Sequence, residues 1–325
     1  MGAALSALMA VMLPSCHGIY DGDLPPCPHG VSLRFVYDYN MEYANAFPTK
    51  VDCVTLYVYD KAGHYVKTLV ETSNVLQDEE WRMLIDLAEG DYHFVAYGGL
   101  ACNEASFAVK AEPGSAIPQL SELSVEMDHV GLTSEKKLHD LFFGTLDVTV
   151  SGDAYQNAAI RMMKDTNNLR VVLQQLNGQP LSDEDFIFCI TDDNTLLDNT
   201  NHTVPNGIIT YSPWAQGQYV VGEDGNDGVT VVYAELSTSR LVTSNAPRFI
   251  VRRTTDGKEI INIPLNEYLL LLKSDLYSDM GAQEFLDRES EWSLVFFLDA
   301  NREWVTTQVI INNWVVRLNG VTITL

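Results

Sequence analysis

The chain has 325 residues, of which 46% are apolar, so it is long enough for two globular domains of ordinary size. Its formal net charge is −24, from 44 acidic and 20 basic side chains. This charge repels phosphate backbones and anionic lipid surfaces, so the composition excludes a nucleic-acid-binding protein and electrostatic adhesion to a membrane.

The start of the chain has the pattern of a lipoprotein signal. Residues 3–13 are apolar apart from Ser6, and this run is too short for a transmembrane helix, which needs about 20 residues. Ser15 is the small residue that a lipoprotein peptidase prefers before the modified cysteine, and Leu13 lies at the apolar position two before it. We therefore predict a signal peptide over residues 1–15, lipid on Cys16 and a tether over residues 16–30. The alternative is a frayed helix with an ordinary buried cysteine.

The next part of the chain is predicted to form a β-sandwich. Apolar and polar residues alternate over residues 31–39, which is the period of a half-buried strand. Further strands are expected at residues 53–59, 64–70, 81–87, 91–97, 122–127 and 146–150. Short strands separated by turns about every ten residues favour an antiparallel sandwich over a parallel sheet with crossover helices. Ser151-Gly152-Asp153 is the expected boundary, so the N-terminal domain is predicted to span residues 31–151.

A second β-sandwich domain is predicted over residues 152–325. Its strands are expected at residues 159–164, 169–176, 186–191, 208–211, 229–236, 248–253, 259–263, 292–298 and 304–318. Pro264 lies at the first turn of a helix over residues 265–273, where its missing N–H does no harm, and residues 282–288 are a second short helix. The second domain therefore carries a helical insertion.

The chain has five cysteines, and four remain if Cys16 carries lipid. An even number suits a compartment in which disulfides persist. If residues 53–59 run antiparallel to residues 91–98, Cys53 approaches Cys102, and their disulfide would close a loop of about 50 residues, worth ~4 kcal/mol. Cys27 competes for either partner, so the pairing stays open. Cys189 lies in a predicted strand and is expected to be a free buried thiol.

Several segments, in the same order along the chain, point to one family. They are residues 23–28 (DLPPCP), 33–40 (LRFVYDYN), 92–99 (YHFVAYGG), 138–144 (LHDLFFG), 166–173 (TNNLRVVL), 190–194 (ITDDN) and 314–317 (WVVR). Together with the cysteine-led start, they resemble the FimB-type fimbrillin-associated anchor proteins. The likeness extends from about residue 16 to the end of the chain.

The resemblance implies a fold, a place and a role. The fold is all-β, with two tandem transthyretin-like antiparallel β-sandwich domains and the short helical insertion in the second. The place is the cell surface, where the lipidated Cys16 holds the chain in the outer membrane. The role is that of a minor fimbrial subunit that attaches the filament to the membrane and limits its length, with fimbrial stalk subunits as partners.

Exchange of a β-strand with a fimbrial subunit is the expected mode of attachment. An unpaired sheet edge exposes backbone donors and acceptors, which recruit an extended segment from a neighbour. Residues 31–39 and 305–325 are the natural exchange elements, because only terminal strands can leave or join a sheet without threading. Of these, the stretch Gln308 to Leu318, with Ile323 and Leu325, is favoured as the surface for a fimbrial partner. The alternative is that both strands complete their own domains.

The sequence predicts no enzyme, no cofactor and no metal site. It contains no G-x-S-x-G, Walker or H-E-x-x-H motif, and its seven histidines lack metal-ligand spacing. His93 and His139 are expected to be satisfied core histidines. The loop at residues 224–228, with Glu235, fails the EF-hand pattern at its fifth and sixth positions. The polar run Asp192, Asp193, Asn194 and Asp198 is expected to be a solvated loop.

Two other functions compete with the anchor. A surface glycan-binding lipoprotein would share the lipid, the acidity and the sandwiches, and would use exposed aromatic rings as stacking platforms. The candidate platforms are Trp214, Trp304 and Trp314. A secreted hydrolase is the weaker alternative, because acidic pairs are expected from composition alone.

Overall fold

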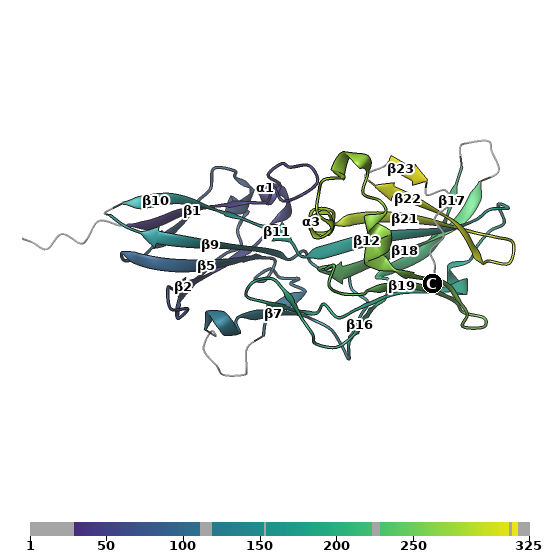
Figure 1. The fold of residues 1–325 in the computed structure, drawn as a ribbon, viewed down its shortest axis with the longest axis horizontal. Coiled ribbons are helices and arrows are strands. Elements are labelled where there is room, and N and C mark those ends of the chain that lie inside the picture. The colour runs from purple at the N-terminus through teal and green to yellow at the C-terminus, as the bar shows by residue number, and fades with distance from the viewer. Residues whose placement is uncertain (1–28, 111–118, 153, 223–227, 312–313, 318–325) are drawn as a thin grey trace, which may run out of the picture.

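The molecule is elongated, with one β-sandwich at each end of its long axis (Figure 1). This computed structural model describes residues 29–110, 119–152, 154–222, 228–311 and 314–317, and for residues 306–311 and 314–317 it describes the backbone only. In Figure 1 the strands β1 and β10 lie at the left end and β17 lies at the right end.

Two sheets form the first sandwich. The smaller sheet has the order β10 (Tyr155–Arg161), β1 (Gly30–Val36) and β4 (Met83–Asp86). The larger has the order β11 (Met163–Lys164), β9 (Phe142–Val150), β5 (Gly90–Gly98), β2 (Val54–Asp60) and β3 (Tyr65–Glu71). The short helices α1 (Phe47–Lys50) and η1 (Asn74–Gln77) belong to the connections of this sandwich.

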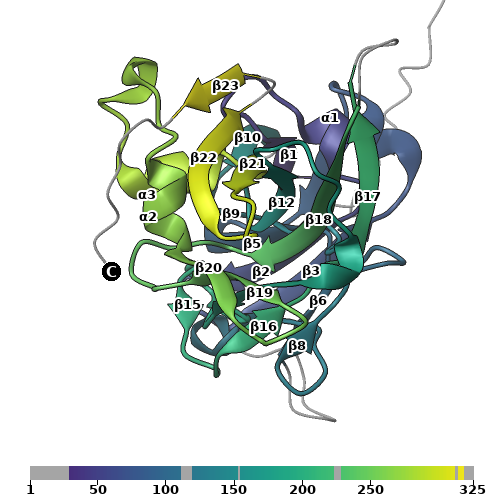
Figure 2. The ribbon, with the colours of Figure 1, turned by 90° about the vertical axis from the view of Figure 1, so that its right-hand side faces the viewer.

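Two larger sheets form the second sandwich. One has the order β17 (Ala215–Val221), β18 (Val229–Ser239), β12 (Thr166–Gln175), β21 (Glu291–Leu298), β22 (Trp304–Ile311) and β23 (Trp314–Arg317). The other has the order β20 (Glu259–Pro264), β19 (Arg248–Arg253), β13 (Phe186–Asp192), β16 (Ile209–Tyr211) and β8 (Thr133–Ser134). The end view in Figure 2 shows the curved six-stranded sheet, with β17 along its outer edge.

The helical insertion lies where the sequence placed it. Helix α2 (Leu265–Leu270) follows Pro264, and helix α3 (Ala282–Arg288) precedes β21. Leu265, Leu269 and Phe285 are buried, so both helices pack their apolar sides on the second sandwich. Three further helical turns are η2 (Leu120–Glu122), η3 (Asp183–Asp185) and η4 (Asp275–Tyr277).

A fifth, four-stranded sheet joins the two halves of the chain. Its order is β15 (Thr203–Val204), β14 (Leu196–Asp198), β7 (Ser124–Met127) and β6 (Phe107–Val109). Strands β6 and β7 come from the segment between β5 and β9, whereas β14 and β15 come from the second sandwich. Backbone hydrogen bonds therefore connect the halves in addition to the covalent link at residues 162–165.

The larger sheet of the first sandwich is buried on both faces along its strand β2. Leu56 and Phe94 face the core between the two sheets, where Val31 and Leu33 of β1 meet them. Tyr59 belongs to the other hydrophobic cluster, which continues under β6 and β7 into the second sandwich. Strand β2 is consequently buried along six of its seven residues, and the alternation expected at residues 53–59 does not appear in its burial.

The predicted all-β fold is confirmed, with a difference in strand direction. The pairs β1–β10, β12–β21 and β8–β16 are parallel, although the sequence favoured antiparallel pairing throughout. Strand β10 pairs with β1 along seven residues, so residues 155–161 belong by hydrogen bonding to the first sandwich. The division at residues 151–152 stays a prediction, and this pairing favours a boundary at residues 162–165.

Candidate functional site

The predicted lipid site lies outside the described residues. The signal peptide at residues 1–15, Cys16 and Cys27 all fall in that part of the chain, and lipidation of Cys16 stays a prediction. The described chain enters the fold at β1, at one end of the long axis (Figure 1). Strand β1 is therefore the element to which the predicted tether would connect.

Strand β1 is held on both sides and is buried. It pairs with β10 over Gly30–Val36 and with β4 over Gly30–Leu33. Val31 and Leu33 are fully buried. Removing this strand would open the core of the first sandwich, so the structure favours the alternative in which residues 31–39 complete their own domain.

The predicted C-terminal strand is a hairpin of two strands. Strand β22 pairs with β21 on one side and β23 on the other, and β23 is an edge strand. Trp314 lies in β23, but its side chain is not described, and Ile323 and Leu325 lie outside the described residues. The exchange predicted for residues 305–325 stays a prediction.

Cys53 and Cys102 form a disulfide in the structure, which is the pairing that the strand order favoured. Their Cα atoms lie 5.5 Å apart. Val54 opposes Gly98 in the β2–β5 ladder, which brings the start of one strand to the end of the other. The bond closes the end of the first sandwich that faces the second one.

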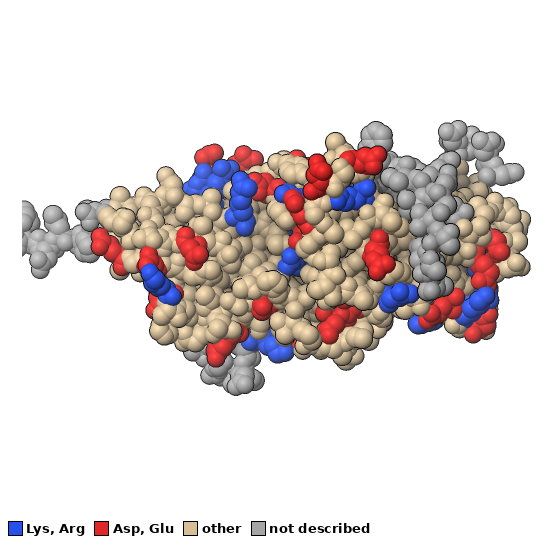
Figure 3. Space-filling view, viewed as in Figure 1, with Lys and Arg blue, Asp and Glu red and all other residues tan. Residues whose placement is uncertain are grey.

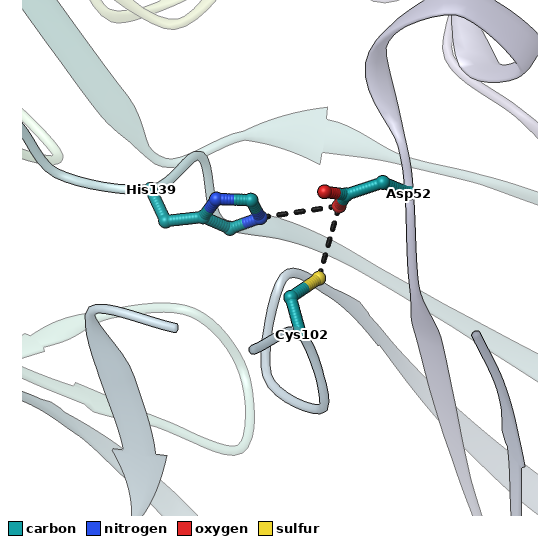
Figure 4. Close-up of side chains that lie close together, drawn as sticks. All are labelled: Asp52, Cys102 and His139. Atoms are coloured by element: carbon teal, nitrogen blue, oxygen red, sulfur yellow. Dashed lines mark hydrogen bonds and ion pairs between the residues drawn. The ribbon is translucent and has the colours of Figure 1, made fainter. Parts of the chain in front are cut away.

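Asp52 and His139 lie beside this disulfide at the rim of the junction (Figure 4). Nε2 of His139 is 3.1 Å from Oδ1 of Asp52, and Sγ of Cys102 is 2.9 Å from the same oxygen. A disulfide sulfur has no proton to donate and carries no charge, so we do not count the second contact as a hydrogen bond. Only two metal-ligating groups then remain, which is fewer than a zinc site needs.

Charged side chains are buried and paired where the sandwiches meet. Lys164 is 7% exposed, and its Nζ lies 3.1 Å from Oδ1 of Asp140 and 3.0 Å from Oε1 of Glu291. These two carboxylates come from opposite sides of the junction, before β9 and at the start of β21. One cation thus joins both sandwiches.

A second buried group surrounds Asp165, which is fully buried. Its Oδ1 accepts a hydrogen bond from Asn201 at 2.8 Å and lies 3.9 Å from Nε of Arg240. Arg240 binds both carboxylate oxygens of Asp287 on α3, at 2.9 and 3.0 Å. Burial raises the pKa of Asp165 to about 7, and the Arg240 guanidinium and the Asn201 hydrogen bond partly oppose that rise.

Helix α3 also contacts the first sandwich through Arg288. The guanidinium carbon lies 4.0 Å from the ring centroid of Tyr39 and 4.6 Å from that of Tyr43, which are cation–π distances. The same guanidinium donates to the carbonyl of Asn40 at 3.3 Å. The sequence analysis did not single out these junction residues, because a charged residue in a sequence is by default a solvated one.

A cleft of about 960 Å³ opens at the junction, with Trp214 on one side. Its other walls carry acidic and basic side chains from both halves, among them Glu135, Lys137 and Asp140. Nζ of Lys137 lies 5.3 Å from the centroid of the Trp214 ring. Figure 3 shows acidic and basic residues interspersed over one face of the molecule, with no continuous basic patch on that face.

The remaining predicted residues lie apart from one another. His93 and His139 are half-buried at the surface, each against a carboxylate, rather than in the core. The solvated loop expected at Asp192 and Asn194 is wrong, because these side chains are 5% and 0% exposed. Among the described residues, the carboxylates of this run form no group with metal-ligand spacing.

Cys189 and Trp304 are both packed in the second sandwich. Cys189 is a buried free thiol, as expected, and burial raises its pKa. The ring of Trp304 meets that of Phe296 edge-on at 5.9 Å and packs on the core cluster. Asp224 of the predicted loop lies outside the described residues.

Comparison with known proteins identifies the family. The family model of fimbrillin-A associated anchor proteins Mfa1 and Mfa2 matches residues 24–320. The chain belongs to this family. The resemblance to fimbrillin-associated anchors is therefore confirmed, and membership gives the chain a fimbria-associated role. Comparison with curated protein sequences gave no match.

Solved structures resemble this member of the anchor family over nearly their whole length. A candidate adhesin from Bacteroides thetaiotaomicron is 57% identical, with a TM-score of 0.85 over 91% of this chain and 100% of that one. A candidate polysaccharide-binding protein from the same organism is 28% identical, with a TM-score of 0.75 over 89% of this chain and 98% of that one. The fimbrial anchor protein Mfa2 from Porphyromonas gingivalis is 17% identical and shares the fold, with a TM-score of 0.64 over 90% of this chain and 99% of that one.

The described helices of this family member are short. None has the length and apolar character needed to cross a bilayer.

Proposed function

We propose that this chain is the lipid-anchored base subunit of a cell-surface fimbria, attaching the filament to the outer membrane and limiting its length. The observation that carries the proposal is the match to the anchor family over residues 24–320. The Leu13-Pro14-Ser15-Cys16 motif supports a tether of two or three acyl chains, which holds a protein in a membrane where one chain does not. A subunit fixed by lipid ends the polymer, so its supply sets filament length.

The fold suits a part that carries tension. The tether joins β1, whose ladders to β10 and β4 must break before the first sandwich opens. Between the sandwiches, the four-stranded sheet and the two ion pairs of Lys164 act beside the covalent link. Tension along the long axis is therefore shared by several contacts.

The filament is held by strand exchange in this proposal. Since β1 and β22 each lie between two partners, β23 is the described part of the stretch at residues 305–325 that is left to exchange with a fimbrial subunit. This strand is an edge, and an edge offers unpaired backbone groups to an incoming segment. We also infer that the chain is not an enzyme, since its role in the family is structural.

The test uses fimbriated cells that produce the chain with the substitution Cys16→Ala. Fimbriae should appear in the medium, and unusually long, while the folded chain is still produced. Cys189→Ala is the matched control, because this cysteine is buried and unpaired in the second sandwich. Fimbriae that stay on cells carrying Cys16→Ala would contradict the proposal.

A glycan-binding role is the second candidate, favoured by one observation. Trp214 is 36% exposed and borders the junction cleft, whose acidic side chains could accept hydrogen bonds from sugar hydroxyls. A similar structure also carries the description of a candidate polysaccharide-binding protein. Retention of the soluble chain on polysaccharide gels, lost in Trp214→Ala, would support this role. If the chain migrates equally in gels with and without polysaccharide, the glycan-binding role is contradicted.

A further inference from the structure

Strand β17 is a long sheet edge that lacks the usual protection. It pairs with β18 from Ala215 to Val221, and no strand of the described chain pairs with its other side. Within the described ranges, its outer row of backbone N–H and C=O groups therefore has no strand partner. Natural proteins blunt such edges with charged residues, proline, bulges or very short strands. None of these devices occurs in β17, which has seven residues and no charge or proline.

The other edge strands of the described chain are short or charged. Strand β3 contains Lys67 and Glu71, and β10 ends at Arg161. Strand β20 begins at Glu259 and ends at Pro264, while β23 has four residues and ends at Arg317. Among the edge strands of the described chain, β17 is thus the one that is both long and uncharged.

The surface of this edge is apolar and its shape is preformed. Tyr219, Val220 and Val221 are 38%, 67% and 49% exposed. Tyr219 packs against Tyr233 of β18 at 5.8 Å between ring centroids, and Arg170 lies 5.9 Å from its ring. An incoming strand would find the acceptor already ordered, so little ordering entropy opposes pairing.

The composition around β17 differs from the rest of this acidic chain. No Asp, Glu, Lys or Arg occurs between Asp198 and Glu223, although such residues make up 20% of the sequence. A charge-free edge neither repels nor requires a charged partner. The chemistry that fits it is an extended, uncharged segment with apolar side chains on both faces.

The position of β17 in the molecule suits it for contact with a filament. It lies at the end of the long axis opposite β1, where the chain enters from the tether (Figures 1 and 2). If lipid holds the tether, β17 is presented away from the membrane. A strand that pairs with it would extend the sheet where a filament has to begin.

We propose that the free edge of β17 receives an extended, uncharged strand of a fimbrial subunit by β-augmentation. This inference rests on the proposed anchor function and adds an attachment point that is not a chain terminus. Seven paired residues correspond to a strand of about 23 Å. Backbone hydrogen bonds supply the affinity, and cross-strand contacts with Tyr219 and Val220 supply the selectivity.

A second copy of the chain is the less suitable occupant. Each copy carries a net charge of −24, so two copies joined along an uncharged edge repel each other without compensating ion pairs. A fimbrial subunit need not have the same net charge, so this repulsion does not necessarily oppose its binding. The choice between the two occupants is part of the test.

The probe is fimbriae sheared from the producing cells, applied to the purified chain in its soluble Cys16→Ala form. Val220→Lys places a charge on the exposed edge and should weaken binding at least about tenfold, because lysine is how natural edges prevent pairing. Val220→Thr keeps the β-branched shape without charge and should bind within about twofold of the parent. Leu84→Lys is the matched control, because Leu84 is 57% exposed on the edge strand β4.

Binding by Val220→Lys equal to that of the parent would overturn the inference. The inference would also be overturned if the parent chain formed a dimer that Val220→Lys dissociates, while fimbriae still bind to this variant. Circular dichroism and thermal melting check that Val220→Lys folds, and Gln218→Lys on the same edge takes its place if it does not. In cells, retention of fimbriae by Val220→Lys and their release by Cys16→Ala would leave the anchor function standing and remove only the β17 site. If cells with Val220→Lys and cells with Cys16→Ala both kept their fimbriae, the anchor function would be contradicted. The binding assay with purified chain would then still test whether β17 binds a fimbrial strand.

Discussion

The junction between the sandwiches and the far edge at β17 use charge in opposite ways. At the junction, Lys164 is buried between carboxylates from both halves of the chain, and the buried side chains of Asp165 and Arg240 are paired with each other. At β17, the side chains are uncharged and exposed, and the backbone is open on one side. Buried ion pairs contribute little net stability but penalise any rearrangement that separates them. The first region therefore resists opening, whereas the second can accept a partner without rearranging.

Arg240→Ala should have the largest effect on stability. It leaves Asp165 and Asp287 buried without their cation, which costs about 3–5 kcal/mol of unfolding free energy. Urea unfolding measures this loss. Arg252→Ala removes an exposed pair with Glu259 and should cost less than about 1 kcal/mol. Equal losses for the two variants would mean that the junction is no different from the surface.

Loss of the disulfide should have the next largest effect. The double variant Cys53→Ser, Cys102→Ser removes a cross-link and should lower the unfolding free energy by about 2–4 kcal/mol. Urea unfolding with and without a reductant tests this directly. The parent and Cys189→Ala should lose stability on reduction, and the double variant should not. Insensitivity of the parent to reductant would show that the bond is absent from the protein.

Asp165→Asn should change the pH dependence of stability. The folded pKa of about 7 lies above the unfolded value, so the folded state binds the extra proton and stability falls as the pH rises towards 7. Asn cannot ionise, so the variant should gain on the order of 2 kcal/mol relative to the parent between about pH 5 and pH 8. The measurement is the difference in unfolding free energy at the two pH values. A constant difference would show that Asp165 does not titrate in this range.

Val220→Thr should have the smallest effect. The side chain is 67% exposed on the edge, so the change should alter the unfolding free energy by less than about 0.5 kcal/mol. Val232→Thr is the matched comparison on the neighbouring strand, where burying a hydroxyl should cost about 1–3 kcal/mol. Thermal melting of the two variants measures the contrast. Similar losses would mean that β17 is packed more tightly than its exposure indicates.

Sequence reasoning found the features that have a local signal. Period-two alternation marked β1, Pro264 marked the start of α2, and adjacency of β2 and β5 favoured the pair Cys53–Cys102. Strand β17 was missed because Ala-Gln-Gly-Gln at its start has no strand pattern.

Other features depend on partners far away in the sequence. Strand β14 has three residues and pairs with β7, which comes from the other half of the chain. The parallel pair β1–β10 joins segments more than 100 residues apart, and no periodicity reports which strand lies beside which. The burial of Asp165 cannot be predicted from the sequence either, since its partners Asn201 and Arg240 come from other strands and loops.

The mass of the N-terminal peptide of the mature chain, isolated from cell envelopes after growth with a labelled fatty acid, tests the lipid attachment most directly. The expected peptide begins at Cys16 and carries the label together with the mass of two or three acyl chains. An unlabelled peptide with a free Cys16, from a chain that leaves the envelope without detergent, would contradict the proposal that lipid on this residue holds the fimbria to the cell.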